Sequence, residues 1–163
     1  MQMYACGQKF AGFEKGKVIK MSNLSRFLKK NKIVKENVFY PVTKSLVDEN
    51  GLPIKWEFKA ITTAQDEIIR DDCTVEVQIT GKPGMFRPRL DTKKYMAKMV
   101  CACCVDPCLD NAELQDSYGV KKAEDLLRAM VDNPGEYQDL LLFVQKNNGF
   151  DVTMDEKVEE AKN

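Results

Sequence analysis

Cysteines near the middle of the chain are the residues whose type and spacing could most readily do chemistry. The pattern C-x-C-C-x-x-x-C is formed by Cys101, Cys103, Cys104 and Cys108, and clustered thiolates can bind zinc or an iron–sulfur cluster. Structural zinc sites place Cys-x-x-Cys pairs on turns, whereas three of these cysteines fall within a predicted helix that directs them to different sides. Buried thiols behave as small hydrophobic groups, so we predict packing residues here and no metal.

Other catalytic constellations are missing from the sequence. The chain contains no histidine, which removes Ser-His and Cys-His nucleophile activation. The acidic pairs Asp71-Asp72 and Glu113 with Asp116 have no identifiable partner group, so helix capping or solvation explains them better than acid–base catalysis. The turn 81–84 is rich in glycine but lacks the spacing of a phosphate-binding loop. We therefore predict that the protein is not an enzyme and uses no cofactor.

The overall composition excludes further classes of function. Lysine plus arginine and aspartate plus glutamate both number 25, so the net charge is zero and no global basic field for nucleic acid exists. No apolar run approaches the roughly 20 residues that cross a bilayer, and charged residues interrupt any signal-peptide core. These features predict a cytoplasmic protein with no nucleic-acid or membrane partner, whose six cysteines are reduced.

The elements that position these residues begin with a predicted β-hairpin over 38–60. Its return arm alternates apolar and charged residues and places Trp56, the only tryptophan, in mid-face. Pro41 confines the first arm to an edge. Thr62 and Gln65 then predict a capped helix, residues 73–80 a third strand, and residues 85–90 an extended segment before a helix that begins at Asp91.

Three further helices are predicted between Val105 and Phe150. The first is expected to begin at a capping box formed by Asp110 and Glu113 and to end at Gly119. An apolar stripe at helical spacing follows. The third helix begins at Asn133, with Glu136 returning to the cap, and ends at Gly149. The fold class predicted is α+β: an N-terminal hairpin or small antiparallel sheet followed by a C-terminal helical bundle, with helix predominating.

The domain organisation follows from the same patterns. Residues 1–20 show no clear period, and Met21 follows a segment that would back-translate to a purine-rich ribosome-binding site. Residues 1–20 are therefore either a leader upstream of a natural start at Met21 or a flexible N-terminal arm. Residues 21–150 are expected to form a single domain, and residues 151–163 an acidic C-terminal tail.

The segments PCLDNAELQDSYGV, AEDLLRAMVDNPGEYQDLL and VQKNNGF closely resemble the C-terminal half of the XkdN-like phage tail assembly chaperones. The segments LSRFLKKNK, LVDENGLPIKWEFKAIT and PRLDTKKYMAKMV extend the resemblance from about Met21 to Phe150. It implies a non-enzymatic assembly factor of long-tailed phages or defective prophages. Such a protein would bind the tape-measure protein and tail-tube subunits in the host bacterial cytoplasm and leave before the virion is complete.

A partner-binding surface is predicted on the last helices. The run Leu140 to Val144 broadens the apolar arc of its helix past a single face, so the helix is either central in the bundle or partly exposed for a partner. The residues we assign to partner binding are Leu126, Met130, Leu142 and Phe143. Whether the chain forms a homo-oligomer is left open, and the alternative function is a small cysteine-based metal- or redox-responsive regulator.

Overall fold

The computed structural model describes residues 24–150. The predicted leader or arm at 1–20, the proposed start at Met21 and the acidic tail at 151–163 lie outside the described residues. The chain divides into two units after Val34. The described part of the first unit contains two short 3-10 helices, η1 (Leu24–Phe27) and η2 (Lys29–Asn31), neither of which has a buried residue.

The second unit contains the predicted hairpin as part of a three-stranded sheet. Its antiparallel strands are β1 (Val38–Pro41), β2 (Lys55–Phe58) and β5 (Cys104–Asp106), in the order β1-β2-β5. Pro41 pairs with Lys55 on the edge strand, as predicted. The strands are shorter than the predicted arms, and the connection turns at Gly51, whose φ of 76° is a left-handed conformation suited to glycine.

The predicted capping box opens helix α1 (Thr63–Asp72). The N–H of Gln65 donates to Thr62 Oγ1 over 3.3 Å, and the N–H of Thr62 donates to Gln65 Oε1 over 2.9 Å. These reciprocal bonds satisfy backbone donors that a helix start leaves free.

The strand predicted over 73–80 exists, but it does not join the hairpin sheet. Strand β3 (Thr74–Gln78) pairs with β4 (Phe86–Leu90) in a separate two-stranded sheet. The second edge of β2 is taken by β5, while a tight turn brings β4 directly beside β3. Alternation of apolar and polar residues identifies a strand but does not specify its partner, and that part of the prediction was wrong.

Helix α2 (Thr92–Cys103) begins at Asp91, whose side chain accepts a hydrogen bond from the Lys94 N–H over 3.1 Å. Apolar residues at helical spacing in the sequence predict a buried face for this helix, and every residue of that face is buried: Tyr95, Met96, Met99, Val100 and Cys103. Cys104 was predicted within this helix, but it begins strand β5 instead. The carbonyl of Cys103 accepts a hydrogen bond from the Lys59 N–H over 2.8 Å, so pairing with the sheet replaces the next helical turn.

The last helices are α3 (Ala112–Ser117), α4 (Ala123–Met130) and α5 (Pro134–Asn147). The cap of α3 is Asn111, one residue after the predicted Asp110, because Asn111 Oδ1 accepts from the Leu114 N–H over 2.9 Å. Asn133 caps α5 as predicted, accepting from the N–H groups of Gly135 and Glu136.

The Glu136 side chain does not return to the α5 cap as predicted. Its Oε1 accepts instead from the Lys44 N–H over 3.2 Å. This bond ties the start of the last helix to the segment that follows β1. A tertiary contact has therefore replaced the local one that the sequence pattern indicated.

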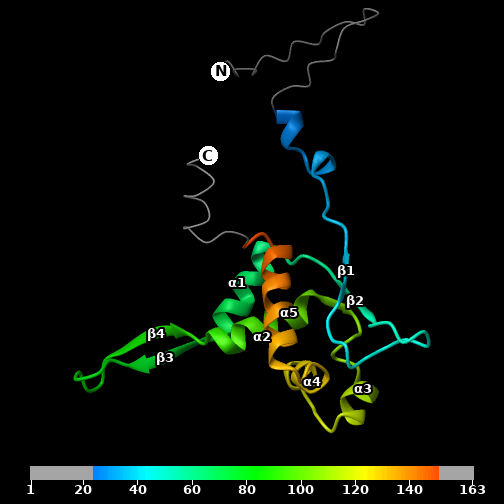
Figure 1. Cartoon of the computed structure of the whole chain (residues 1–163). Helices are drawn as coiled ribbons and strands as arrows, with labels where there is room; N and C mark the ends of the chain where they lie inside the picture. The colour runs from blue at the N-terminus through cyan, green and yellow to red at the C-terminus, as the bar shows by residue number, and fades with distance from the viewer. Residues whose placement is uncertain (1–23, 151–163) are drawn as a thin grey trace, which may run out of the picture. The chain divides into compact units, whose positions relative to one another are not determined.

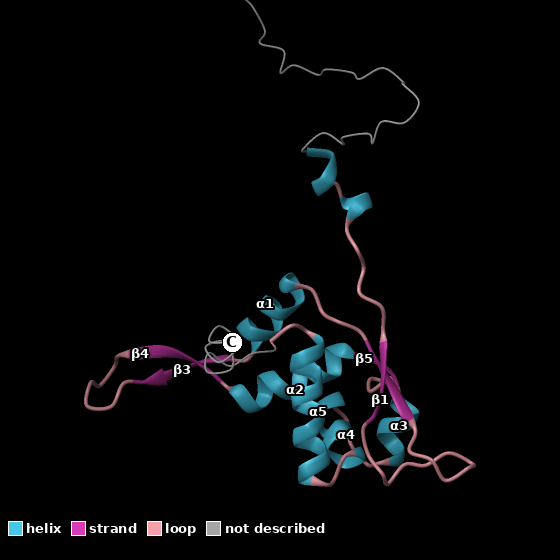
Figure 2. Ribbon diagram, turned by 45° about the horizontal axis from the view of Figure 1, so that its top comes forward, coloured by secondary structure: helices cyan, strands magenta, loops and turns pink. Residues whose placement is uncertain are grey.

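Helix α5 is central in the second unit (Figures 1 and 2). Leu140 and Val144 are fully buried in the core. On the adjoining face, the Phe143 ring stacks on Tyr40 with centroids 4.1 Å apart and meets Phe58 edge-on at 5.4 Å. The helix is therefore enclosed by the other helices on one side and by the sheet on another. Helix predominates over strand in the described residues, so the predicted α+β class is confirmed.

Candidate partner-binding groove

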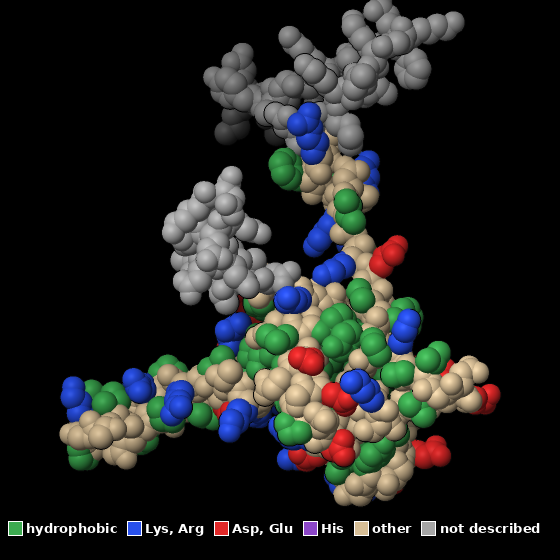
Figure 3. All heavy atoms as spheres, viewed as in Figure 1, with side chains coloured by type: hydrophobic (Ala, Val, Ile, Leu, Met, Phe, Trp, Pro, Cys, Tyr) green, Lys and Arg blue, Asp and Glu red, His purple; other side chains and the backbone are tan. Residues whose placement is uncertain are grey.

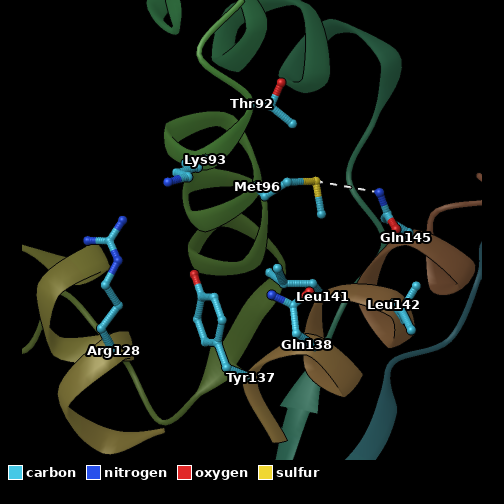
Figure 4. Close-up of a pocket in the computed structure, with 9 residues that line it drawn as sticks. All are labelled: Thr92, Lys93, Met96, Arg128, Tyr137, Gln138, Leu141, Leu142 and Gln145. Atoms are coloured by element: carbon cyan, nitrogen blue, oxygen red, sulfur yellow. Dashed lines mark hydrogen bonds between the residues drawn. The ribbon is translucent and has the colours of Figure 1, made fainter. Parts of the chain in front are cut away.

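A groove of about 480 Å³ lies between α2, α4 and α5. Figure 4 shows the side chains around it, which come from all three helices. Its lining consists of Thr92, Lys93 and Met96 from α2, Arg128 from α4, and Tyr137, Gln138, Leu141, Leu142 and Gln145 from α5.

The packing of α5 explains why its side chains line the groove. Successive helical residues are about 100° apart around the axis. Because Leu140 and Val144 point into the core, Leu141 and Leu142 project to the side and toward solvent. Gln145 lies one turn further on, and its Nε2 is 3.5 Å from Met96 Sδ (Figure 4), which joins the two walls.

The groove combines the apolar side chains of Met96, Leu141 and Leu142 with polar ones, and it is cationic at one end. Lys93 and Arg128 lie on the side opposite Leu142 and Gln145 (Figure 4). Arg128 Nη1 is 3.1 Å from Asp125 Oδ1 in an exposed pair, and Arg128 also forms a hydrogen bond with the Tyr137 side chain. A guanidinium has five donors, so some are left for another group. Burial raises the pKa of Tyr137 despite the opposing effect of Arg128, so this phenol stays neutral near pH 7. An apolar ligand with a negative charge at one end would match this arrangement.

The structure places the four predicted partner-binding residues in different environments. Leu126 and Met130 are buried in the core, and Phe143 is half-buried against Tyr40 and Phe58. Leu142 is 55% exposed and lines the groove. Partner binding by these residues stays a prediction, and we carry it forward for Leu142 because its side chain is accessible.

Several groove residues were not singled out from the sequence. Thr92 and Lys93 belong to the first turn of α2, while Gln138 and Gln145 are polar positions of α5. The polar residues have no distinguishing local pattern, because the groove exists only where separate helices meet. A signal that could have found part of it is the pairing of the broad apolar arc on α5 with the neighbouring methionines of α2.

Most of the cysteines among residues 24–150 are packed within the protein. Cys73 and Cys103 are buried, Cys101 and Cys104 are half-buried, and Cys108 is exposed. Burial raises the pKa of Cys101 and of Cys104 to about 12, so these thiols stay protonated at neutral pH and are poor nucleophiles and ligands. Among residues 24–150, no three cysteine, aspartate or glutamate side chains group closely enough to hold a metal ion.

One residue of each acidic pair noted in the sequence forms surface ion pairs. Asp72 accepts a hydrogen bond from Lys98 and lies 3.6 Å from Lys94 Nζ. Asp116 lies 2.5 Å from Lys121 Nζ, with both side chains mostly exposed. Such pairs contribute little to stability. Their exposed geometry is that of solvated surface charges and not that of acid–base catalytic groups. Within the described residues, no helix has the length and apolar character needed to cross a bilayer.

These features define a small α+β protein with a groove between helices α2, α4 and α5 on its surface. The family model for phage XkdN-like tail assembly chaperone proteins matches residues 24–162. Because the match covers most of the chain, the protein belongs to this family. The resemblance predicted from the sequence motifs is thereby confirmed.

Two proteins of Bacillus subtilis (strain 168) are similar along nearly their whole length. The uncharacterized protein YqbN is 28% identical over 144 residues, covering 88% of this chain and 95% of YqbN. The phage-like element PBSX protein XkdN is 26% identical over 141 residues, covering 86% and 94%. The crystal structure of YqbN matches with a TM-score of 0.66 and 26% identity over 81% of this chain and all of that one.

Proposed function

We propose that this protein is a non-catalytic chaperone that binds the tape-measure protein and tail-tube subunits during phage tail morphogenesis. It would act in the host bacterial cytoplasm and leave before the virion is complete. Membership of the tail assembly chaperone family supports a role in tail assembly. The similarity to XkdN of the phage-like element PBSX supports an origin in a phage or prophage.

The observation that carries this proposal is the groove between α2, α4 and α5. Unassembled tape-measure helices carry long apolar faces that would aggregate in water. One apolar face of such a helix fits a groove lined by Met96, Leu141 and Leu142, in the helix-in-groove mode of recognition. Acidic residues of the same helix would lie beside Lys93 and Arg128. Met96 can adjust to different side chains because a thioether is flexible and polarizable.

The cysteine-based regulator receives less support from the structure. A redox or metal response needs accessible thiolates, and burial holds the pKa of Cys101, Cys103 and Cys104 above the ordinary value. We therefore keep the chaperone as the single proposed function.

Co-expression with the tape-measure protein tests the proposal. We expect the wild-type chain to keep the tape-measure protein soluble and to co-purify with it. The variant Leu142→Gln should weaken this binding by about tenfold or more, because burying a leucine at an interface contributes about 1.5–3 kcal/mol. The matched control is Leu52→Gln, a similarly exposed leucine (62% against 55%) outside the groove.

Two outcomes would count against the proposal. Failure of the wild-type chain to solubilise or retain the tape-measure protein would contradict the function itself. Equal binding by the two variants would keep the function and remove the groove as its site. Adding purified tail-tube protein to the complex tests the second partner, and we expect it to be retained on the column with the other two chains.

A further inference from the structure

The groove between α2, α4 and α5 is lined by cationic and apolar side chains and by no carboxylate. Lys93 and Arg128 lie on the same side of it (Figure 4), and basic side chains are visible on this part of the chain in the space-filling view (Figure 3). Lys93 is exposed and forms no ion pair with any of residues 24–150. A segment that combines apolar residues with carboxylates would therefore complement the groove.

The last described residue lies at the wall of this groove. Phe150 donates its N–H to the carbonyl of Gln145 over 3.0 Å, and Gln145 lines the groove. Gly149 has a φ of 85°, the left-handed conformation that ends a helix and turns the chain away from the helix axis. Residues 151–163, the acidic tail, therefore continue from a point next to the groove.

The acidic tail is long enough to cross the groove. Tyr137 and Gln145 mark the two ends of the α5 wall, and they are about 12 Å apart along the axis at 1.5 Å per residue. The thirteen residues of the tail would span about 20 Å as a helix and about 43 Å as an extended chain. Either length exceeds that of the wall. The family match also runs to residue 162, so it includes nearly all of the tail.

The net charge of the tail is opposite to that of the groove. The tail contains five acidic and two basic residues, which gives a net charge of −3. Its apolar residues are Val152, Met154, Val158 and Ala161, and its carboxylates belong to Asp151, Asp155, Glu156, Glu159 and Glu160. The apolar residues match the apolar part of the groove lining, and the carboxylates match its two cations.

Attachment to the same chain favours the tail over any free ligand of the same chemistry. A segment joined to its site by a short linker has an effective concentration in the millimolar range. An intrinsic dissociation constant of about 0.1 mM would then keep the groove about 90% filled. Such an affinity needs only a few contacts, and a second copy of the chain at micromolar concentration would not compete.

We propose that the acidic tail binds in the α2–α4–α5 groove of its own chain and is displaced when a partner helix binds there. Apolar side chains of the tail would contact Met96, Leu141 and Leu142, and its carboxylates would lie beside Lys93 and Arg128. The tail would thus cover the apolar lining of the groove when no partner is present. The displacement rests on the function proposed above, whereas the docking of the tail does not.

Methyl NMR of the full chain tests the docking directly. We expect nuclear Overhauser contacts between the methyl groups of Met154 or Val158 and those of Leu141 or Leu142. Their intensity relative to contacts within the core should not change on dilution, because both groups belong to one chain. The variant Leu142→Gln should weaken the contacts that remain at Leu141, whereas Leu52→Gln, outside the groove, should preserve all of them.

A charge exchange tests the electrostatic part of the proposal. Lys93→Glu should weaken the contacts between the tail and the groove, because it places a carboxylate beside the acidic tail. Combining Lys93→Glu with Glu159→Lys and Glu160→Lys should restore them. Restoration distinguishes an attraction between opposite charges from a local disturbance of α2.

The displacement is measured by calorimetric titration of the full chain with a designed helical peptide. The peptide has about 20 residues, long enough to form a helix in water, with leucine on one face and glutamate on the other. The variant Met154→Gln with Val158→Gln should bind it about tenfold more tightly, because a groove that is only about 10% free lowers the apparent affinity by that factor. The control, Thr153→Gln with Asn163→Gln, changes the same segment without removing its apolar residues and should bind like the wild type.

The two measurements separate failure of this inference from failure of the proposed function. Absence of contacts between tail and groove in the wild-type chain would overturn the docking, whether or not the peptide binds. Contacts between differently labelled chains in a mixture would make a second copy the occupant and would also overturn it. Contacts that persist at saturating peptide, or equal peptide affinity for the two tail variants, would overturn the displacement.

Discussion

At the scale of single residues, a small polar network joins α1 to α2. Tyr95 donates a hydrogen bond to Asp66 Oδ1, and Arg70 Nη2 is 3.0 Å from Asp66 Oδ2 and 3.2 Å from Tyr95 Oη. The guanidinium also lies 5.0 Å from the centre of the Tyr95 ring, within the range of a cation–π contact. These contacts hold the outer helix against the one that carries the core.

The network makes stability depend on pH at both extremes. Burial raises the pKa of Asp66, but hydrogen bonds from Tyr95 and Arg70 outweigh burial and bring the pKa below its ordinary value of 3.8. The stabilisation is therefore complete above about pH 4 and is lost as pH falls through the folded pKa. Burial and the bond to Asp66 raise the pKa of Tyr95 from 10.0 to about 12, so its contribution is lost as pH rises through that range.

The substitution Tyr95→Phe should lower the free energy of unfolding by about 1–3 kcal/mol near pH 7, because it removes a hydrogen bond to a carboxylate. The loss should shrink below pH 4, where Asp66 becomes protonated. Urea unfolding at a series of pH values measures both effects. Tyr118→Phe, at an exposed position, is the control and should be near neutral; a pH-independent loss at Tyr95 would argue against this network.

The burial of single side chains could be predicted where helical periodicity determines which face is buried. The buried face of α2 was predicted correctly because apolar residues recur there at helical spacing. The same reasoning identified Leu142 as an extra apolar residue, but it could not separate Leu142 from Leu126 and Met130. An apolar stripe shows which face avoids water, and only the tertiary packing shows what covers that face.

At the scale of elements, α5 is confined on two sides and open on a third. Leu140 and Val144 pack into the core, Phe143 packs on Tyr40 and Phe58, and Leu142 faces solvent. Neighbouring residues of α5 therefore have different roles. The helix that builds the core also supplies one wall of the groove.

We expect Phe143→Ala to destabilise the fold by about 3 kcal/mol, at the lower end for large aromatic truncations because the ring is only half-buried. Leu142→Ala, one position away on the exposed side, should change stability by no more than about 0.5 kcal/mol. Urea unfolding of the two variants measures the contrast. Similar losses for both would show that Leu142 also contributes to the core.

Element boundaries were predictable where local chemistry fixes them. The caps at Thr62, Asp91 and Asn133 were assigned correctly because each satisfies nearby backbone donors. Strand β5 was missed because three residues are too few to show alternation, and the sheet partner of β3 was assigned wrongly. Both errors concern pairing between strands distant in the chain, which local sequence does not encode.

At the scale of the whole second unit, sheet and helices share one core. Trp56 is 1% exposed and belongs to the same buried cluster as Met99, Leu127 and Leu140. The groove likewise needs three helices at once, which is why its polar lining could not be predicted from any one segment. Removing one element would therefore expose the apolar faces of the others.

This shared core predicts cooperative unfolding. Trp56 is the only tryptophan, so its fluorescence reports on the sheet, while far-ultraviolet circular dichroism reports mainly on the helices. We expect the two signals to change at the same urea concentration, as two-state behaviour requires. Separate midpoints would mean that the sheet and the helical bundle unfold independently.

The position of Leu142 has a consequence for how such a protein diverges. Its neighbours Phe143 and Val144 pack against the interior of the protein. A substitution at residue 142, in contrast, alters the exposed surface of α5 without disturbing the core packing. Under the function proposed above, substitutions at this position would change the fit to a partner one exposed residue at a time. The fold would stay the same while the binding preference of the groove changed.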